Sequence, residues 1–310
     1  MLSDAPIFIV GPPRSGTHLL RFCLTQHSRI YIAPETFYFL RIYCDRKLQK
    51  DLFSGGRTDS VVDRILSFQG DPTMGDLEGQ RAELKSVVSD AIDYRDFAEK
   101  FFGYLAQQEG KARWGEKSPL HALYISQILS VFPNAKIVYV MREAKNTLAS
   151  TLKSTHVHFN FFKALAVYKA CLMEKNRYDD HSQVFSLDYE AFVEHPAHYL
   201  EELCVFLGEE FESIMLSPGM ADSSYSDDVM ERRQDIGIRK DDPLKWRRGL
   251  SDQQGAFIDS VMSGHRRAYL STSGLRFLTA RVALFMRMLK NRLGYFSLAE
   301  RVSALFQSNR

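Results

Sequence analysis

A glycine-rich turn near the start of the chain has the residue types of an anion-binding site. It runs from Gly11 to His18, between the apolar segments 6–10 and 19–24. The first segment, rich in β-branched residues, predicts a buried strand, and the second predicts a helix packed against a sheet. The amides of such a loop and the positive end of the helix dipole favour phosphate. A phosphate cradle is therefore predicted, with a plain strand–turn–helix carrying an incidental arginine as the alternative.

The turn has the glycine spacing of a nucleoside-triphosphate P-loop without its lysine. Four residues separate Gly11 from Gly16, and Thr17 and His18 stand where that motif has Lys followed by Ser or Thr. The cation within the loop is instead Arg14. Because the P-loop lysine reaches the β- and γ-phosphates and the hydroxyl holds Mg²⁺, the turn predicts a phosphate site without triphosphate or metal chemistry.

A second cationic site is predicted at the end of another strand. The apolar segment 136–141 reads as a buried strand that ends at Arg142, and Ser150 follows two helical turns later. Ligands of open α/β sheets bind outside the carboxyl ends of the strands, so both side chains can address one phosphate. The strand carries no acidic metal ligand, which argues against a Mg²⁺-dependent triphosphatase.

Two further charged residues each allow two interpretations. Glu35 stands at a predicted junction between a loop and a helix, where it either caps the helix or removes a proton from an acceptor hydroxyl. Lys117 precedes Ser118 and Pro119, which predict a helix cap and first turn, with the helix running to about Phe132. The Lys117 ammonium either faces an anion or is solvated.

Composition excludes several classes of protein. Among 310 residues, 40 are basic and 38 acidic, so general nucleic-acid binding is not predicted. Four scattered cysteines predict reduced thiols in the cytoplasm, and no apolar stretch is long enough for a membrane span. His156 and His158 have no third ligand nearby in the sequence, so no metal site is predicted.

Alternating apolar strands and amphipathic helices predict an α/β fold, with a P-loop-type parallel sheet flanked by helices on both faces and with helical insertions. We expect residues 1–275 to form one domain, with a helical substrate-side insertion at about 37–112 and a polar loop at 217–243 over the site. Residues 276–310 predict a basic amphipathic helix. Because 280–310 carries six basic residues and one acidic residue, this helix either lies on an anionic membrane or docks on its own domain.

Together these residues resemble the sulfotransferase family that uses 3′-phosphoadenosine-5′-phosphosulfate (PAPS), in particular the tyrosylprotein sulfotransferase branch and its bacterial relatives. The family's Pro-Arg-Ser-Gly-Thr core, which binds the 5′-phosphosulfate, recurs at 13–17. Its strand-end Arg and the Ser eight residues later, which bind the 3′-phosphate, match Arg142 and Ser150. Two departures are that His18 replaces a common Thr and that Glu143 stands where the family usually has Asp.

Four weaker motifs follow in the family's order, and the resemblance covers roughly residues 6–250. They are Glu35-Thr36, Lys117 with Pro119, Tyr189-Glu190 with the downstream His195-Pro196, and Lys245-Trp246. In the family the Glu is the catalytic base, the first Lys supports the leaving phosphosulfate, the Tyr contacts the adenine side and the last Lys reaches the cofactor phosphates.

The resemblance implies a metal-independent enzyme that transfers a sulfuryl group from PAPS to a hydroxyl, or alternatively an amine, and releases PAP. Glu35 would be the general base, and Arg14 and Lys117 would stabilise developing charge. A base beside several cations should have a lowered pKa. The implied cofactor-binding residues are Pro13, Arg14, Ser15, Gly16, Thr17, His18, Arg142, Ser150, Tyr189, Lys245 and Trp246.

The acceptor is expected to be a small molecule, a lipid or a glycan. We expect a cytoplasmic protein and no nucleic-acid partner, and both a peripheral membrane contact through 280–310 and a homodimer stay open. The alternative functions are a non-catalytic binding module of the same fold and a degenerate kinase-like nucleotide-binding protein.

Overall fold

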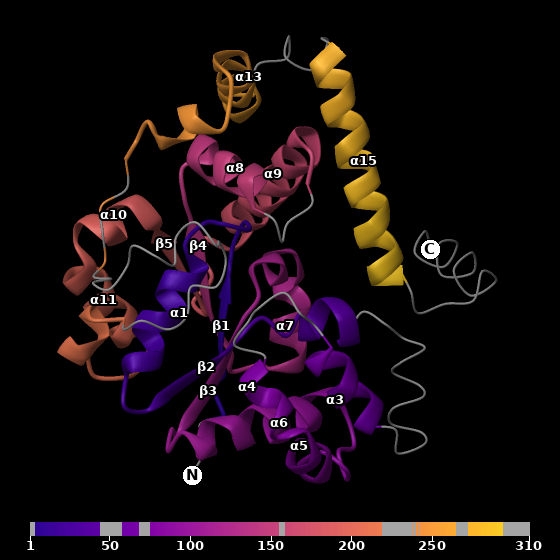
Figure 1. Ribbon diagram of the computed structural model, residues 1–310, viewed down its shortest axis with the longest axis vertical. Helices are drawn as coiled ribbons and strands as arrows, with labels where there is room; N and C mark the ends of the chain where they lie inside the picture. Colours follow the sequence, from indigo (N-terminus) through magenta and orange to yellow (C-terminus); the bar gives the residue numbers. More distant parts are fainter. Residues whose placement is uncertain are drawn as a thin grey trace.

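The computed structural model describes residues 4–43, 58–67, 75–154, 159–218, 238, 240, 242–264 and 272–293. Its centre is one parallel sheet with the strand order β2-β3-β1-β4-β5 (Figure 1). The strands are β1 (Ile7–Val10), β2 (Ile30–Ala33), β3 (Arg113–Lys117), β4 (Lys136–Met141) and β5 (Val184–Asp188). The predicted α/β fold with a parallel sheet is confirmed.

One layer of helices covers the face of the sheet to which Ile7 and Ile9 of β1 point. These side chains pack in one apolar cluster with Leu20 and with Leu200. The helices and the 3₁₀ helix of this layer are α1 (Thr17–Gln26), α10 (Tyr189–Glu194), α11 (Pro196–Leu207) and η4 (Ser213–Leu216). Since β1 alternates its side chains between faces, Phe8 and Val10 point to the opposite layer.

The opposite layer is built mainly from the segment between β2 and β4. It contains the π-helix η1 (Phe39–Tyr43), α3 (Thr58–Leu66), α4 (Gly75–Glu78), α5 (Arg81–Val87), α6 (Tyr94–Gln108), the 3₁₀ helix η3 (Pro119–Tyr124) and α7 (Ile125–Val131). Aromatic rings fill its core: Tyr38 stacks on Phe97, and Phe102 stacks on Trp114 with ring centroids 5.1 Å apart. The described part of the 37–112 segment is therefore largely helical.

Strand β3 is a correction to the sequence analysis, which took no strand from this segment. Its residues, Arg-Trp-Gly-Glu-Lys, are all buried although three of them are charged. Arg113 is compensated by backbone carbonyls, because it donates to Ala5 O at 2.7 Å and to Leu207 O at 2.6 Å. The search for apolar runs missed β3 because a strand can bury charges when each one has a partner.

The helix predicted from Pro119 to about Phe132 is present in two parts, a 3₁₀ helix followed by α7. Ser118 occupies the predicted N-cap position, with Pro119 in the first turn, but it does not cap the helix through its side chain. The Ser118 side chain makes no capping bond; it donates to Glu116 and accepts from the Phe37 amide instead.

Helices above the carboxyl end of the sheet complete the described structure. They are α8 (Ala144–Lys153), α9 (Phe161–Tyr178), the 3₁₀ helix η5 (Lys245–Arg248), α13 (Asp252–Met262) and α15 (Thr272–Leu293). In Figure 1, α15 runs along the outer side of the molecule, and it packs against α9. None of the described helices has the length and apolar character needed to cross a membrane. His156, His158 and most of the predicted 217–243 loop lie outside the described residues.

Candidate active site

Two glycines shape the loop between β1 and α1. Gly16 has φ 101°, and a Cβ there would lie 2.2 Å from Cδ2 of Tyr189. Gly11 has φ 153°, and its Cβ would lie 2.2 Å from the carbonyl oxygen of Val140. Neither position tolerates a side chain, because backbone or a packed ring occupies the space. Gly16 is also the N-cap of α1, so the first-turn amides of that helix are available at the loop.

Arg14 joins the two predicted phosphate-binding motifs. Its Nε donates to Ser150 Oγ at 3.2 Å, and its carbonyl oxygen accepts from Arg142 at 3.2 Å. The residue itself has φ 70°, a left-handed conformation that is strained for a side chain larger than glycine and is typical of functional sites. Residues 136 positions apart in the sequence are thus in direct contact.

Tyr189 connects the loop to the end of β4. Its ring fills the space beside Gly16 and lies under the Arg142 guanidinium, 4.8 Å from ring centre to Cζ. The Tyr168 hydroxyl donates to the Arg142 carbonyl at 2.7 Å, and Glu190 Oε1 lies 3.9 Å from the Nε of Arg142. Burial raises the pKa of Glu190 above its ordinary value. Arg142 is therefore held in place along its whole length and is only 8% exposed at the side chain.

Glu35 and Lys117 form an ion pair at the ends of β2 and β3. Lys117 Nζ donates to Glu35 Oε1 at 2.7 Å, and the lysine side chain is 1% exposed. The interpretation of Lys117 as a solvated lysine is therefore wrong. The pairing follows from the sheet: β2 and β3 are parallel neighbours in which Ala33 is opposite Glu116, so the residues after each strand meet at one edge.

The sheet order also places this ion pair beside the loop. β1 lies between β3 and β4, with Ile9 opposite Lys117 on one side and Val10 opposite Tyr139 on the other. In addition, the Gly11 amide donates to the Pro119 carbonyl at 3.0 Å. The carboxyl ends of the three strands therefore bring Lys117, the loop and Arg142 together in that order.

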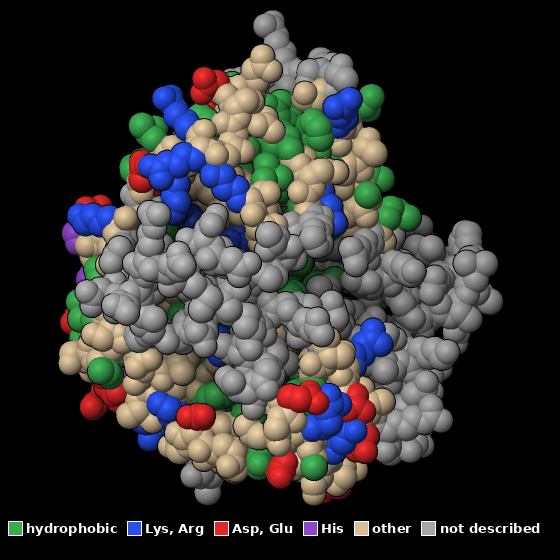
Figure 2. Space-filling view, viewed as in Figure 1, with side chains coloured by type: hydrophobic (Ala, Val, Ile, Leu, Met, Phe, Trp, Pro, Cys, Tyr) green, Lys and Arg blue, Asp and Glu red, His purple; other side chains and the backbone are tan. Residues whose placement is uncertain are grey.

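Lys245 and Trp246 lie on η5, which packs on α8. The Trp246 amide donates to Asn146 Oδ1 at 2.9 Å, and its indole is buried against Leu148 and next to Gly255. Figure 2 shows Lys and Arg side chains gathered at the upper left, where Figure 1 has the orange segment that leads to α13 and contains η5. Trp246 thus anchors this short helix and with it Lys245, although a contact of either residue with the cofactor stays a prediction.

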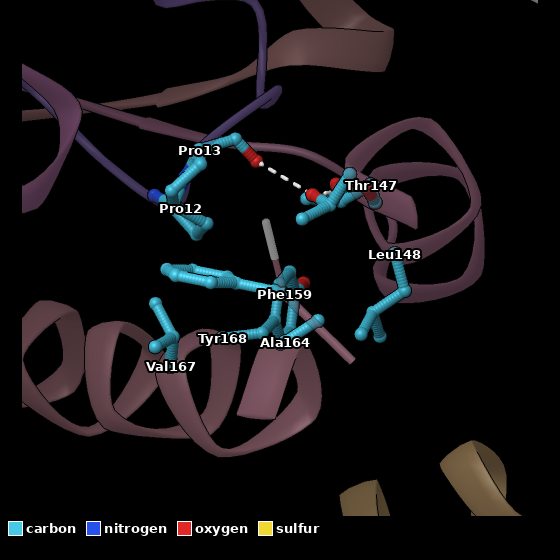
Figure 3. A pocket seen from close by; sticks show the side chains of 9 residues that line it. Pro12, Pro13, Thr147, Leu148, Phe159, Ala164, Val167 and Tyr168 are labelled. Carbon is cyan, nitrogen blue, oxygen red and sulfur yellow. Dashed lines mark hydrogen bonds between the residues drawn. The ribbon is translucent and has the colours of Figure 1, made fainter. Parts of the chain in front are cut away.

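A small hollow, with space for about one water molecule, lies behind the loop (Figure 3). In the figure Pro12 and Pro13 face the ring of Phe159, with Thr147 and Leu148 of α8 to one side. The Pro13 carbonyl accepts from the Thr151 hydroxyl at 3.3 Å. The lining is mostly apolar and does not suit a phosphate. We therefore assign the lining side chains a structural role, in which they support the loop from behind.

The loop fits a phosphate. Ser15 Oγ is completely buried and has no hydrogen-bond partner within the described residues. A buried hydroxyl without a partner is unusual, and an anion bound at the loop would accept from it. Thr17, at the first position of α1, is 3% exposed. His18 stacks edge-on against Phe22 with centroids 4.4 Å apart, which orients its ring along α1. Among the described residues no three His, Cys, Asp or Glu side chains cluster as metal ligands would.

Comparison with known proteins gives the family. The family model described as "Sulfotransferase family" matches residues 6–213, from the residue before β1 to the first residue of η4. The chain belongs to the sulfotransferase family. The predicted family is confirmed, and sulfuryl transfer is the chemistry that the family supports.

Its relatives share the chain's fold at low identity. A protein-tyrosine sulfotransferase of Drosophila melanogaster is 24% identical over 221 residues, which cover 68% of this chain and 39% of that protein. The sulfotransferase domain of the Synechococcus PCC 7002 olefin synthase aligns with a TM-score of 0.55 at 20% identity, over 84% of this chain and 95% of that one. The sulfotransferase domain from the curacin biosynthetic pathway gives a TM-score of 0.56 at 19% identity, over 85% and 99%.

The sequence analysis missed a buried polar cluster below the Glu35–Lys117 pair. Its members are Thr36, Glu116, Ser118 and His121, each at most 1% exposed. The signal that would have found it is the placement of Glu116 and His121 on either side of Ser118 and Pro119, in a segment whose other residues are largely apolar or small.

Proposed function

We propose that this sulfotransferase uses PAPS as donor and transfers its sulfuryl group to an acceptor hydroxyl without a metal. The observation that carries the proposal is the contact of Arg14 with both Ser150 and Arg142. It makes the loop and the β4 end one cationic site, which suits a nucleotide with phosphate at both its 5′ and 3′ positions. A nucleoside diphosphate or triphosphate would leave the second half of that site unused.

When bound, PAPS supplies a sulfuryl group already activated on its 5′-phosphate, and PAP is the product. The loop amides, Ser15 and Thr17 would hold the 5′-phosphate, as the N-terminus of α1 favours. Arg142 and Ser150 would hold the 3′-phosphate, with Lys245 reaching it from η5. Tyr189, held beside Gly16, would form one wall of the adenine side.

At the other end of the site, Glu35 would accept the proton of the acceptor hydroxyl, since it is the carboxylate at the β2–β3 edge that remains partly exposed, at 16%. Lys117 and Arg14 would stabilise the negative charge that develops on the 5′-phosphate as the sulfuryl group departs. The acceptor in this proposal is a small molecule, a lipid or a glycan that carries the hydroxyl. An amine acceptor would need the same base.

The choice between PAPS and an ordinary adenine nucleotide is tested by isothermal titration with PAP, ADP and ATP. We expect PAP to bind at least about tenfold more tightly than ADP, because a charge-assisted phosphate contact is worth more than about 1.4 kcal/mol. Equal affinity for the three nucleotides, or no binding of PAP, would contradict the proposal and support a degenerate kinase-like protein.

The role of Glu35 is tested with Glu35→Gln and radiolabelled PAPS, with a boiled cell extract as the source of acceptor. A general base contributes about 10²–10⁴-fold, so the variant should lose transfer by that factor and still bind PAP. Glu83→Gln, on the exposed side of α5, is the matched control and should be fully active. Full activity of Glu35→Gln would exclude Glu35 as the base, and no transfer by the wild type would favour the non-catalytic binding module.

A further inference from the structure

The buried polar cluster lies directly below the ion pair at the β2–β3 edge. Thr36 follows Glu35, and Glu116 precedes Lys117. Glu116 and Thr36 are each 1% exposed, and Ser118 and His121 are completely buried. None of the four has a part in the proposed transfer step. Burying several polar groups is unfavourable unless they form hydrogen bonds with one another. The hydrogen bonds within the cluster therefore show what it stabilises.

Glu116 is the centre of the cluster. Its Oε1 accepts three hydrogen bonds: from the Thr36 amide at 3.2 Å, from the Thr36 hydroxyl at 2.9 Å and from the Ser118 hydroxyl. Its Oε2 lies 3.0 Å from Nδ1 of His121. Burial alone would raise the pKa of Glu116, but the nearby His121 and the hydrogen bonds outweigh burial and hold that pKa below its ordinary value. The carboxylate is therefore charged at neutral pH.

Two dipeptides contact each other across the ends of the neighbouring strands β2 and β3. Glu35-Thr36 follows β2, and Glu116-Lys117 ends β3. The outer members pair at 2.7 Å, Glu35 with Lys117, and the inner members pair at 2.9 Å, Thr36 with Glu116. The inner contact fixes the backbone immediately after Glu35. The position of the outer carboxylate therefore depends on the inner, buried carboxylate.

The turn that carries Glu35 is also strained. Phe37 has φ 52°, a left-handed conformation that is rare for an aromatic residue. Its amide donates to Ser118 Oγ at 3.1 Å, and Ser118 in turn donates to Glu116. Strain of this kind persists only where the surroundings over-determine the backbone, and it clusters at functional sites. The cluster supplies that constraint through side chains some 80 residues away in the sequence.

We propose that Thr36 and Glu116 are positioning residues, which hold the Glu35 carboxylate against Lys117 at the edge of the sheet. The inference rests on the proposed role of Glu35 as the base. Neither residue touches the donor or the acceptor; both act through the backbone of the Glu35 turn. The charged state of Glu116 matters because three donors converge on one of its oxygens, and an ionised acceptor makes each of those bonds stronger.

The first test uses Thr36→Val, which keeps the shape of the side chain and removes its hydroxyl. With radiolabelled PAPS and boiled extract, kcat should fall at least tenfold, whereas the KM for PAPS and the affinity for PAP should stay within twofold. Thr36→Ser, which restores the hydroxyl, should recover most of the lost kcat. Thr25→Val is the matched control, because within the described part of the chain the Thr25 hydroxyl bonds to the Arg21 carbonyl in its own helix α1; it should be fully active. An unchanged kcat in Thr36→Val, or no recovery with serine, would overturn the inference.

A double-mutant cycle separates positioning from general damage. If Thr36 acts through Glu35, Thr36→Val should change the residual rate of the Glu35→Gln variant by less than twofold. Losses that multiply in the double variant would contradict the inference while leaving Glu35 as the base. A fully active Glu35→Gln would instead refute the proposed base, so the two failures are distinguishable.

A second measurement needs no transfer activity. Amide hydrogen exchange of a peptide spanning 34–38 should be at least tenfold faster in Thr36→Val and in Glu116→Gln than in the wild type. In Thr36→Val the Tyr38 amide loses its acceptor, the Thr36 hydroxyl, and in Glu116→Gln the acceptor of the Thr36 amide loses its charge. Exchange in the Thr25→Val control should be unchanged. If Glu116→Gln does not fold, Thr36→Val alone decides the outcome. Unchanged exchange at 34–38 in a folded Thr36→Val protein would also overturn the inference.

Discussion

The two ends of the active site are built in different ways. At the cofactor end, the loop between β1 and α1 gets its shape from the backbone: two glycines that admit no side chain and a left-handed Arg14. At the Glu35–Lys117 end, the shape comes from side chains: a buried carboxylate collects hydrogen bonds from a neighbouring strand end. Recognition of the 5′-phosphate, as proposed, would thus rest on local conformation, and the orientation of the proposed base on long-range contacts.

The difference has a physical reason. A phosphate is bound mainly by amides and a helix N-terminus, which a short segment can supply by itself. A general base must sit within hydrogen-bond reach of one proton, and a turn of irregular backbone cannot fix that position without help from other parts of the chain. Damage to the first region should therefore abolish binding, and damage to the second should impair turnover with binding intact.

The largest effect is expected from Gly16→Ala. The new Cβ would be 2.2 Å from the Tyr189 ring at a φ of 101°, so either the loop or the tyrosine must move. We expect PAP affinity to fall more than about 100-fold, about 2.7 kcal/mol. Gly208→Ala is the matched control: φ is 74° there and nothing lies within 4 Å of the added Cβ, so only a cost of about 1 kcal/mol in stability is expected. Titration with PAP measures the affinity, and thermal unfolding measures the stability. Unaltered PAP affinity in Gly16→Ala would contradict the idea that the backbone shape of the loop determines cofactor binding.

A smaller effect is expected from Arg142→Lys, which tests a side chain at the cofactor end. Lysine keeps the charge but lacks the planar guanidinium that lies over Tyr189 and reaches the Arg14 carbonyl. We expect PAP to bind about tenfold more weakly, about 1.4 kcal/mol, and ADP to be affected less, so that the preference for PAP narrows. Arg177→Lys, exposed on α9, serves as the control. An equal loss for both nucleotides would argue against a 3′-phosphate at Arg142.

Lowering the pH should destabilise the Glu35 turn before it destabilises helix α1 at the other end of the site. Because the folded protein lowers the pKa of Glu116 below its ordinary value of 4.5, the carboxylate contributes stability that is fully present above that value and is lost as the pH falls through the folded pKa. Protection of the amides at 34–38, measured as their exchange rate relative to the intrinsic rate at each pH, should accordingly begin to fall below about pH 4.5, at a higher pH than protection in α1. Glu116→Gln should show no such step, and a step of the same size in that variant would assign the effect to another group.

The smallest effect concerns a buried thiol below the phosphate loop. Cys23 lies in α1, and burial raises its pKa to about 12; Cys171 lies in α9 on the opposite side of the sheet with the same elevation of its pKa. Both thiols should resist a disulfide reagent at pH 8 in the native protein. PAP should slow the residual labelling of Cys23 several-fold and that of Cys171 less, as mass spectrometry can measure. Equal protection would indicate that PAP stabilises the whole fold and not α1 in particular.

How much was predictable depends on which residues carry the feature. The strands at 7–10 and 136–141 were found because they are almost entirely apolar, and the loop because glycine spacing is local. Strand β3 was missed because it is not an apolar run: three of its buried side chains are charged, and Arg113 is compensated by residues far along the chain, such as the Leu207 carbonyl. The side-chain capping bond expected of Ser118 is absent because its hydroxyl donates to the buried Glu116 and accepts from the Phe37 amide, which is 81 residues away in the sequence.

The sequence by itself determined the class of fold, the family and the position of the glycine-rich loop, because periodicity and glycine spacing are properties of short segments. Only the tertiary structure decided that Lys117 is buried and paired with Glu35, that Arg14 contacts Ser150, and that Glu116 supports the Glu35 turn. These are contacts between the carboxyl ends of parallel strands, which are far apart along the chain and become neighbours only when the sheet has formed.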